Sequence, residues 1–507
     1  MDNNKHLNAQ QLKTIIDSAR KIMRKDKGLN GDLDRLPMLT WIMFLKLLDD
    51  LDKVSESEAL LSNKKYEPII DTPYRWRDWA SKDDGITGDE LISFINQEKT
   101  IRPDGTEGLG LLAYLKRLSG DGHSRKDVVG NIFSGTVNRM INGYLLRDVL
   151  NKINEIHFNS TEELNLLGTI YESMLKEMRD AAGDSGEFYT PRPVVKFMVE
   201  MINPTLGEKI LDPACGTGGF LSETFLHLLK QSKTVDDYSI LQNSSIYGQE
   251  AKPLPYLLVQ MNLILHGMEY PNITFGNTLD RKLTEIGDNE RVDVVLTNPP
   301  FGGEEEDGIK ANFPADLQTS ETALLFLLYI IRKLKKYNDE NKGRAAVIVP
   351  DGFLFAGNVC EKIKETLIEN MNLHTIVKLP FGVFEPYTPI RSNILFFENR
   401  KNESKGTWFY ELPIADGRKK YSKTKPILYS EFSDCINWWN NRQENEYAWF
   451  VSSDELKNRH YDLSMKNPNA KKNVDERNMM EIYKSMNDSS NEIKKLLNDI
   501  ESIIKEV

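Results

Sequence analysis

Short apolar runs alternate with helical segments between residues 209 and 412, and this alternation limits the possible folds more than any other feature of the chain. The clearest runs are KILDPA (209–214), VDVVL (292–296) and AAVIVPD (345–351). Continuous apolar runs are typical of parallel strands with two buried faces. The pattern predicts an α/β fold in which helices cover both faces of a doubly wound, mostly parallel sheet. Ligands of such sheets bind where strands end, so the residues that follow each run are the candidates for a site.

The residues before the alternating region predict helices. Leu36, Leu39, Met43 and Leu47 recur at helical spacing, and similar stripes continue to about residue 153. Stripes of this kind are typical of the core of a helical bundle. We therefore expect a helical N-terminal domain at residues 1–155, with a polar, turn-rich connection at residues 98–108, and a catalytic domain at residues 156–412.

Beyond residue 412 the chain becomes polar and rich in Lys, Asn, Asp and Glu. Its last residues recover an apolar period of alternating four and three, the spacing of a coiled-coil seam: Ile493, Leu497, Ile500, Ile504 and Val507. Two heptads are too few to form a stable helix alone. Residues 413–507 are predicted to be a C-terminal extension ending in a docking helix, which packs either on another subunit or on its own chain.

A glycine-rich turn, DPACGTGGF, follows the first apolar run. Gly216, Gly218 and Gly219 allow a ligand to approach the backbone closely, although a plain tight turn would also use them. The next run ends at Glu250, where nucleotide sites of this fold keep an acid for ribose hydroxyls. Asp212 inside the turn would repel a pyrophosphate but attract a sulfonium group, which favours S-adenosylmethionine over a dinucleotide.

The run at residues 292–296 is followed by Asn298-Pro299-Pro300-Phe301. Consecutive prolines remove two backbone donors and fix the chain in an extended shape, so the turn presents a rigid row of acceptors. The Asn298 side-chain oxygen and the Pro299 carbonyl could accept from an amino group on a planar ligand, and Phe301 could stack on its face. An extruded nucleobase is such a ligand. A simple stop between strand and loop is the alternative.

The overall composition excludes several functions. The net charge is −11 with a pI near 5.4, so the chain has no basic excess for binding nucleic acid alone. The three cysteines are isolated and no Cys/His cluster has metal-ligand spacing, so we expect neither disulfide nor metal. No apolar run approaches the roughly 18 residues of a membrane span. A cytoplasmic location, with no membrane partner, is expected.

With these motifs in order, the chain resembles the modification (M) subunits of type I restriction-modification systems. DPACGTGGF, an acid ending the next strand and NPPF are similar to motifs of class I S-adenosylmethionine-dependent methyltransferases that modify adenine in DNA. GEFYTPRPVV upstream of the glycine turn resembles their gamma motif order, and LPFGVFEPYTPIRSNILFF (379–397) resembles a later segment. The resemblance covers roughly residues 5–410. It implies a methyltransferase sheet of seven strands.

The resemblance also implies roles for individual residues. Asn298, Pro299, Pro300 and Phe301 would form the catalytic turn. The cofactor S-adenosylmethionine would be held by an upstream segment, the glycine turn and two later positions: Glu187, Phe188, Tyr189, Thr190, Pro191, Arg192, Asp212, Gly216, Thr217, Gly218, Gly219, Glu250 and Asn277. In the late loop, Thr388 and Phe384 would either help hold the target base or pack a hairpin.

The expected function is transfer of a methyl group to N6 of a flipped adenine in DNA, without a covalent enzyme intermediate. Because no stretch looks like a target-recognition domain, sequence reading is assigned to a separate specificity (S) subunit. A second M subunit and a restriction (R) subunit are further expected partners. The alternatives are a protein or RNA methyltransferase with the same pocket, and a non-catalytic assembly scaffold.

Two other residues suggest chemistry that the pattern does not support. Cys215 could be a nucleophile, but it lies in the cofactor turn, and Asn298 occupies the expected target position. Pro350-Asp351 after a strand is similar to the start of a metal-dependent nuclease motif, yet no Glu-x-Lys follows on a neighbouring strand. We expect Asp351 to lie in an ordinary turn between strand and helix.

Overall fold

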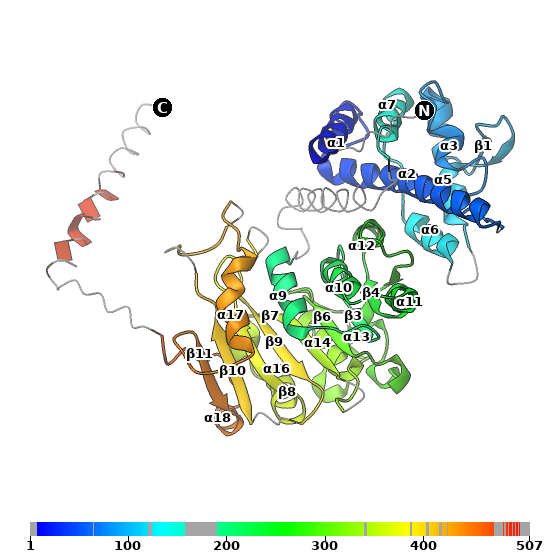
Figure 1. Ribbon diagram of the computed structural model, residues 1–507. Helices are drawn as coiled ribbons and strands as arrows, with labels where there is room; N and C mark the ends of the chain where they lie inside the picture. Colours follow the sequence, from blue (N-terminus) through cyan, green and yellow to red (C-terminus); the bar gives the residue numbers. More distant parts are fainter. Residues whose placement is uncertain are drawn as a thin grey trace.

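A computed structural model describes most of the chain (Figure 1). The described residues are 8–63, 65–119, 124–157, 190–338, 342–385, 388–401, 405–414, 418–422, 424–470 and scattered positions between 480 and 496. Glu187, Phe188 and Tyr189 lie outside them, as does most of the predicted coiled-coil seam. Within the described tail, Ile493 is exposed. The part of the chain that is described has no helix of the length and apolarity that crossing a membrane requires.

The N-terminal region is a helical domain, as predicted. Its helices are α1 (Ala9–Met23), α2 (Asp32–Leu61), α3 (Trp76–Trp79), α4 (Gly88–Asn96), α5 (Leu111–Lys116), α6 (Arg125–Ser134) and α7 (Gly143–Asn154). Every residue from Met38 to Asp50 of α2 is buried, so this helix is the centre of the domain. The connection at residues 98–108 contains an antiparallel hairpin, β1 (Lys99–Ile101) and β2 (Glu107–Leu109), that was not predicted. Its turn uses Gly105 at φ +80°.

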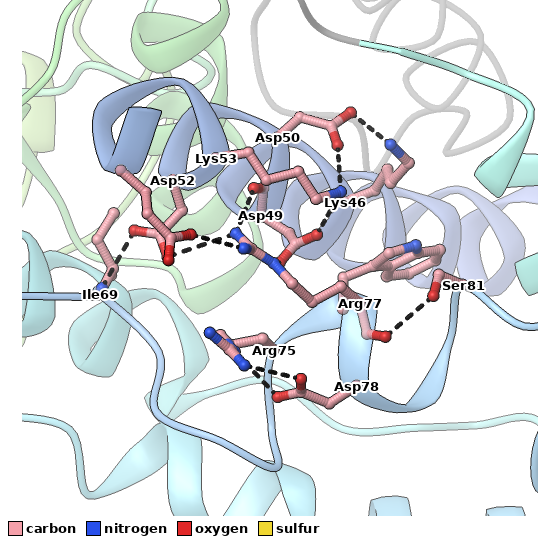
Figure 2. Close-up of polar contacts among 12 residues, drawn as sticks. Lys46, Asp49, Asp50, Asp52, Lys53, Ile69, Arg75, Arg77, Asp78 and Ser81 are labelled. Atoms are coloured by element: carbon pink, nitrogen blue, oxygen red, sulfur yellow. Dashed lines mark hydrogen bonds and ion pairs between the residues drawn. The ribbon is translucent and has the colours of Figure 1, made fainter. Parts of the chain in front are cut away.

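A polar cluster lies between α2 and α3 in this domain (Figure 2). We call it the α2–α3 charge cluster and define it as Lys46, Asp49, Asp50, Asp52, Lys53 and Arg77. Lys46 pairs with Asp50, and the two side chains are 2% and 4% exposed. Arg77 Nε donates to Asp49 Oδ1 at 2.8 Å, which ties α3 to α2. Each carboxylate of the cluster therefore lies within ion-pair distance of a cation.

The catalytic domain contains a nine-stranded sheet with the order β11-β10-β8-β9-β7-β6-β3-β4-β5. The strands are β3 (Ile210–Asp212), β4 (Ile246–Glu250), β5 (Asn272–Phe275), β6 (Val294–Thr297), β7 (Arg344–Pro350), β8 (Asn372–Lys378), β9 (Ser392–Glu398), β10 (Gly406–Glu411) and β11 (Ala448–Ser452). Neighbours pair in parallel except for β9 and β11. The predicted mostly parallel sheet is confirmed, and it is two strands wider than expected because β10 and β11 extend one edge.

Alternate residues of each strand enter two separate cores, which makes the sheet doubly wound. Val294 and Leu296 of β6 pack under one set of helices, whereas Val295 faces the other set. The first face is covered by α9 (Arg192–Ile202), α10 (Gly219–Leu229), α12 (Pro253–Leu265) and α17 (Ser433–Trp439). The second face is covered by α14 (Thr322–Lys333), α15 (Gly352–Phe355), α16 (Val359–Glu365) and α18 (Ser453–Asn458). Burial on both faces explains the continuous apolar runs in the sequence.

The extra edge is fastened by aromatic side chains that follow residue 412. Phe432 stacks on Phe197 of α9 with ring centroids 4.5 Å apart. Trp449 of β11 stacks on Phe409 of β10 at 5.3 Å. The sheet and its covering helices therefore continue at least to α18, past the point where the catalytic domain was expected to end. Shorter described helices are α11 (Val235–Ser244) and α13 (Asp307–Lys310).

Helix α12 joins the two domains. All residues from Tyr256 to Leu265 are buried, which is unusual for a surface helix. Tyr256, Val259 and Leu263 pack on the sheet, whereas Leu258 and Met261 belong to the core of the N-terminal domain. Figure 1 shows α12 between the catalytic sheet and helices α2 and α6. A helix that is apolar on all sides is thus explained by burial against both domains.

Candidate active site

The glycine turn lies where β3 ends and α10 begins. Gly216 and Gly218 have φ values of +53° and +81°, which L side chains rarely adopt. A Cβ on Gly218 would lie 2.6 Å from Val259 Cγ2 of α12, so glycine is required there by packing as well. A Cβ on Gly216 would meet no atom within 4 Å. The backbone at Gly216 therefore borders open space that a ligand can enter.

Glu250 meets this turn from the end of the neighbouring strand β4. The Gly216 N–H donates to Glu250 Oε2 at 2.9 Å, and the Lys252 N–H donates to Oε1 at 2.8 Å. The residue is 8% exposed, and burial raises the pKa of its carboxyl group. The two predicted cofactor elements are therefore brought together at one edge of the sheet. A carboxylate with lone pairs beside open space is suited to accept from hydroxyl groups.

Asp212 is buried beneath the turn and has a partner that the sequence did not reveal. The Thr297 hydroxyl donates to Asp212 Oδ1 at 2.7 Å, and the Ala214 N–H donates to the same oxygen at 3.1 Å. Burial raises the pKa of Asp212 to about 7, and the nearby Glu250 carboxylate adds to the increase. Because Thr297 directly precedes Asn298, Asp212 links the glycine turn to the asparagine turn across β3 and β6.

Asn298 lies at the end of β6 with one half of its amide paired. Its Nδ2 donates to Thr190 Oγ1 at 3.1 Å. Its Oδ1 is buried and has no hydrogen-bond partner among the residues that the structure describes. An unpaired buried acceptor costs on the order of 1–3 kcal/mol, and a ligand that donates to it would remove this cost. The predicted acceptor is therefore present and has no donor from the described protein.

Phe301 follows the two prolines and is 7% exposed. It belongs to the core on the α9 and α10 face of the sheet, together with Phe384 and Leu379. Pro299 is buried and Pro300 is exposed. The turn is therefore rigid at both ends, because β6 holds Asn298 and the core holds Phe301.

Pro191 and Arg192 start helix α9 beside the glycine turn. The Arg192 Nη1 donates to the Gly219 carbonyl at 2.7 Å and to Ser222 Oγ at 3.2 Å. Arg192 thus ties the start of α9 to the start of α10. The carbonyl of Pro191 accepts from the amides of Val194 and Val195, which fixes the first turn of α9. Thr190 is held in place directly before this turn.

The remaining predicted cofactor positions lie around the same edge. Asn277 follows β5, and its Oδ1 accepts from the Leu279 N–H at 3.0 Å. Thr217 lies at the tip of the glycine turn, where its carbonyl accepts from Asn262 Nδ2 of α12 at 2.8 Å. Sequence reasoning missed Asn262 and Thr297. A fully buried asparagine within the apolar stretch PLPYLLVQMNLIL was the signal that could have identified Asn262.

Four further candidates have contacts that favour structural roles. Burial raises the pKa of the Cys215 thiol well above its usual value, so the thiolate needed for nucleophilic attack is disfavoured. Thr388 Oγ1 accepts from the Ile390 N–H at 3.0 Å, and Phe384 is part of the core, which favours hairpin packing for both. Asp351 accepts from Asn393 Nδ2 at 3.2 Å in the turn before α15.

A doubly wound sheet with a glycine turn, a strand-end acid and an asparagine turn along one carboxyl edge is the arrangement of an α/β methyltransferase. Comparison with known proteins agrees. Residues 162–477 match the N-6 DNA methylase family, and residues 12–153 match the HsdM N-terminal domain. The chain is 48% identical over 468 residues to the methylase subunit of the Escherichia coli type I restriction enzyme EcoEI. The aligned residues cover 90% of each protein.

Solved structures show the same relationship. A modification subunit described for a type I restriction enzyme of Vibrio vulnificus YJ016 has 59% sequence identity and a TM-score of 0.85, over 92% of this chain and 99% of that one. A chain from a study of complex assembly in a type I restriction-modification system has 35% identity and a TM-score of 0.78, over 99% of both chains. The chain therefore belongs to the N-6 DNA methylase family, among the methylase subunits of type I restriction enzymes.

Proposed function

We propose that this chain transfers the methyl group of S-adenosylmethionine to N6 of an adenine in DNA, within a complex whose specificity subunit reads the sequence. The observation that carries the proposal is the buried Asn298 Oδ1 beside the glycine turn, which has no hydrogen-bond partner in the part of the chain that is described. An amino group extruded from DNA supplies the donor that this oxygen lacks. Family membership and the names of the relatives support the same activity.

The residues around the glycine turn fit the cofactor. A Cβ on Gly216 would meet no described atom within 4 Å, which supports close approach of an adenosyl group, and the Glu250 carboxylate can accept from its ribose hydroxyls. Asn277 lies one strand further, on the side assigned to the adenine ring. When bound, S-adenosylmethionine supplies an electrophilic methyl group on a positively charged sulfur. No cation of the described residues pairs with Asp212 or Glu250, so these acids favour a positively charged ligand.

The asparagine turn would prepare the amino group for attack. The lone pair of an adenine amino group is delocalised into the ring, which makes the nitrogen a poor nucleophile. Acceptance by Asn298 Oδ1 and the Pro299 carbonyl draws the nitrogen toward tetrahedral geometry, so these contacts become stronger as its bond to carbon forms. Stacking of the base on Phe301 would return roughly 1–3 kcal/mol of the cost of flipping.

A specificity subunit is the first partner in this proposal. The acidic net charge of −11 leaves phosphate contacts and base reading to another chain. A second copy of the methylase subunit and a restriction subunit complete the proposed assembly, in keeping with the related chain known from a type I complex. The complex would act in the cytoplasm, where chromosomal DNA is accessible.

The test uses the full chain with labelled S-adenosylmethionine and DNA, with and without the cognate specificity subunit. We expect label at N6 of one adenine per strand of the recognised site, only when both subunits are present. A matched DNA carrying N6-methyladenine at that position keeps the duplex, but its acceptor nitrogen already bears the methyl group, so it should take up little label.

Three results would contradict parts of the proposal. Site-specific methylation by this chain alone would remove the need for a specificity subunit. Label in a protein or RNA, but not in DNA, would favour the alternative methyltransferase function. Absence of transfer to any substrate in the full complex would favour a scaffold.

A further inference from the structure

Thr190 was predicted to line the cofactor, and its hydroxyl also contacts the asparagine turn. The Asn298 Nδ2 donates to Thr190 Oγ1 at 3.1 Å, although the residues are 108 positions apart. No other hydrogen bond of the Asn298 side chain connects it to a described residue, because Oδ1 has no partner. Among the described residues, Thr190 is therefore the hydrogen-bond partner that holds the Asn298 side chain in place.

The orientation matters because the two ends of an amide have opposite hydrogen-bonding character. With Nδ2 on Thr190, the acceptor Oδ1 is presented to the site. A flipped amide would present its NH2 group to the amino group of the base, so two donors would face each other. The Thr190 hydroxyl accepts from Nδ2 in the productive orientation. Because a hydroxyl can also donate, the flipped amide is disfavoured by the donor that the target amine presents, and not by Thr190 alone.

Thr190 is itself held by the elements that form the cofactor side. It directly precedes α9, whose Val194, Val195 and Met198 are fully buried. Arg192 ties the start of this helix to Gly219 at the glycine turn. The backbone of Asn298 is held from the other side, because the preceding Thr297 donates to Asp212 at 2.7 Å. Thr297 thus holds the backbone of Asn298, and Thr190 holds its side-chain amide.

We propose that Thr190 is a positioning residue for methyl transfer, which acts by holding the Asn298 side chain in place through its Nδ2 and leaves Oδ1 for the target amine. This inference rests on the proposed function, since it assigns Asn298 to the amine. It changes the expected role of Thr190 from cofactor affinity to the rate of the chemical step.

The test compares Thr190→Val and Thr190→Ser in the full chain assembled with its specificity subunit. Valine has a similar shape but no hydroxyl, whereas serine keeps the hydroxyl and loses a methyl group. Single-turnover methylation is measured at saturating S-adenosylmethionine and DNA, and the cofactor dissociation constant is measured separately by equilibrium dialysis. Thr366→Val, which removes a hydroxyl bonded to the Lys362 carbonyl on the protein surface, is the control for loss of a threonine hydroxyl.

We expect Thr190→Val to lower the single-turnover rate on the order of 10- to 100-fold, because misplacement of a catalytic group carries a cost of this size. Its cofactor dissociation constant should stay within about threefold, and Thr190→Ser should recover most of the rate, since serine keeps the hydroxyl that accepts from Asn298 Nδ2. Thr366→Val should match the wild type in both measurements.

Each other outcome overturns the inference. An unchanged rate in Thr190→Val would show that the amide needs no partner at position 190. A weaker cofactor affinity with an unchanged saturated rate would make Thr190 a cofactor contact. Loss of rate in both variants without recovery by serine would indicate a packing role. If the wild-type complex itself does not methylate DNA, the proposed function fails and this inference fails with it, whereas wild-type methylation leaves the variants to decide.

Discussion

The α2–α3 charge cluster and the polar residues at the carboxyl edge of the sheet are both buried, but their polar atoms are paired in different ways. We call Asp212, Glu250 and Asn298 the sheet-edge cluster. In the α2–α3 charge cluster, Asp49 and Asp50 pair with Lys46, Lys53 and Arg77 (Figure 2). At the sheet edge, Asp212 and Glu250 accept only from amides and a hydroxyl, and no cation of the described residues shifts their pKa values. The charges of the α2–α3 charge cluster are thus paired within the cluster, whereas the sheet edge has carboxylates and an acceptor that a ligand can pair with.

This difference separates a structural cluster from a functional one. Burial of paired charges is costly, yet removal of one partner costs more because it leaves the other uncompensated. The α2–α3 charge cluster should therefore contribute to stability and not to chemistry. The sheet-edge cluster keeps the pKa of Asp212 near 7 and Asn298 Oδ1 unpaired, which destabilises the free protein and favours binding.

The largest expected effect separates chemistry from stability at Asn298. Asn298→Ala removes the acceptor for the target amine, so the single-turnover rate should fall on the order of 10³-fold. Because Oδ1 has no described partner, thermal stability and cofactor affinity should change little. Rate is measured with labelled S-adenosylmethionine, and affinity by equilibrium dialysis. Retained turnover would show that Asn298 is not the acceptor and that both clusters are structural.

The second largest effect is expected at Lys46, where a substitution should lower stability and leave the methylation rate unchanged. Lys46→Ala leaves Asp50 buried without its main partner, so the free energy of unfolding should fall by about 3–5 kcal/mol. The methylation rate per folded complex should stay close to the wild-type rate, since the pair lies in the other domain. Urea unfolding gives the first quantity and single-turnover methylation the second.

The double variant Lys46→Met/Asp50→Leu is the control for the charge at these positions. It replaces both partners by apolar side chains of similar length, so it should recover most of the lost stability. A loss below about 1 kcal/mol in Lys46→Ala would show that the α2–α3 charge cluster does not hold α2 in place.

Asp212 should give the stability of the sheet-edge cluster a dependence on pH. Its pKa is raised from 3.8 to about 7 in the folded protein, so the folded state binds a proton that the unfolded state releases. The stability that this protonation contributes is complete below pH 4 and is lost as the pH rises through 7. Between pH 5 and pH 8 the loss should be about 2–3 kcal/mol, since one pKa unit corresponds to about 1.4 kcal/mol.

Asp212→Asn isolates this contribution, because asparagine can still accept from Thr297 and Ala214 but does not titrate in this range. Urea unfolding at several pH values should show the decline in the wild type, and a smaller decline in the variant. Parallel curves for both proteins would place the pKa of Asp212 near its usual value.

Of the two clusters, only the one at the sheet edge was predicted from the sequence, and the α2–α3 charge cluster was not. The acceptor turn, the glycine turn and Glu250 were found because each follows an apolar run, and parallel strands bring their carboxyl ends together. The bonds from Thr297 to Asp212 and from Asn298 to Thr190 could not be predicted, because they join residues 85 and 108 positions apart and depend on rotamers. We also did not predict that β11 belongs to the sheet, because its burial depends on aromatic partners elsewhere in the chain.

The smallest expected effect concerns the contact between the domains that carry the two clusters. Arg125 of α6 pairs with Glu269 and lies over the Tyr270 ring at 5.4 Å, and its side chain is 31% exposed. Exposed pairs contribute about 0.2–1 kcal/mol, so Arg125→Ala should lower stability by about 1 kcal/mol once the aromatic contact is included. The difference from the wild type should shrink in 1 M NaCl, where the Debye length is about 3 Å.

The apolar residues of α12 should then hold the domains together, because Leu258 and Met261 lie in the N-terminal core. A loss above about 3 kcal/mol that persists at high salt would assign the contact to Arg125 instead, and it would make an exposed ion pair as important to this fold as the buried α2–α3 charge cluster.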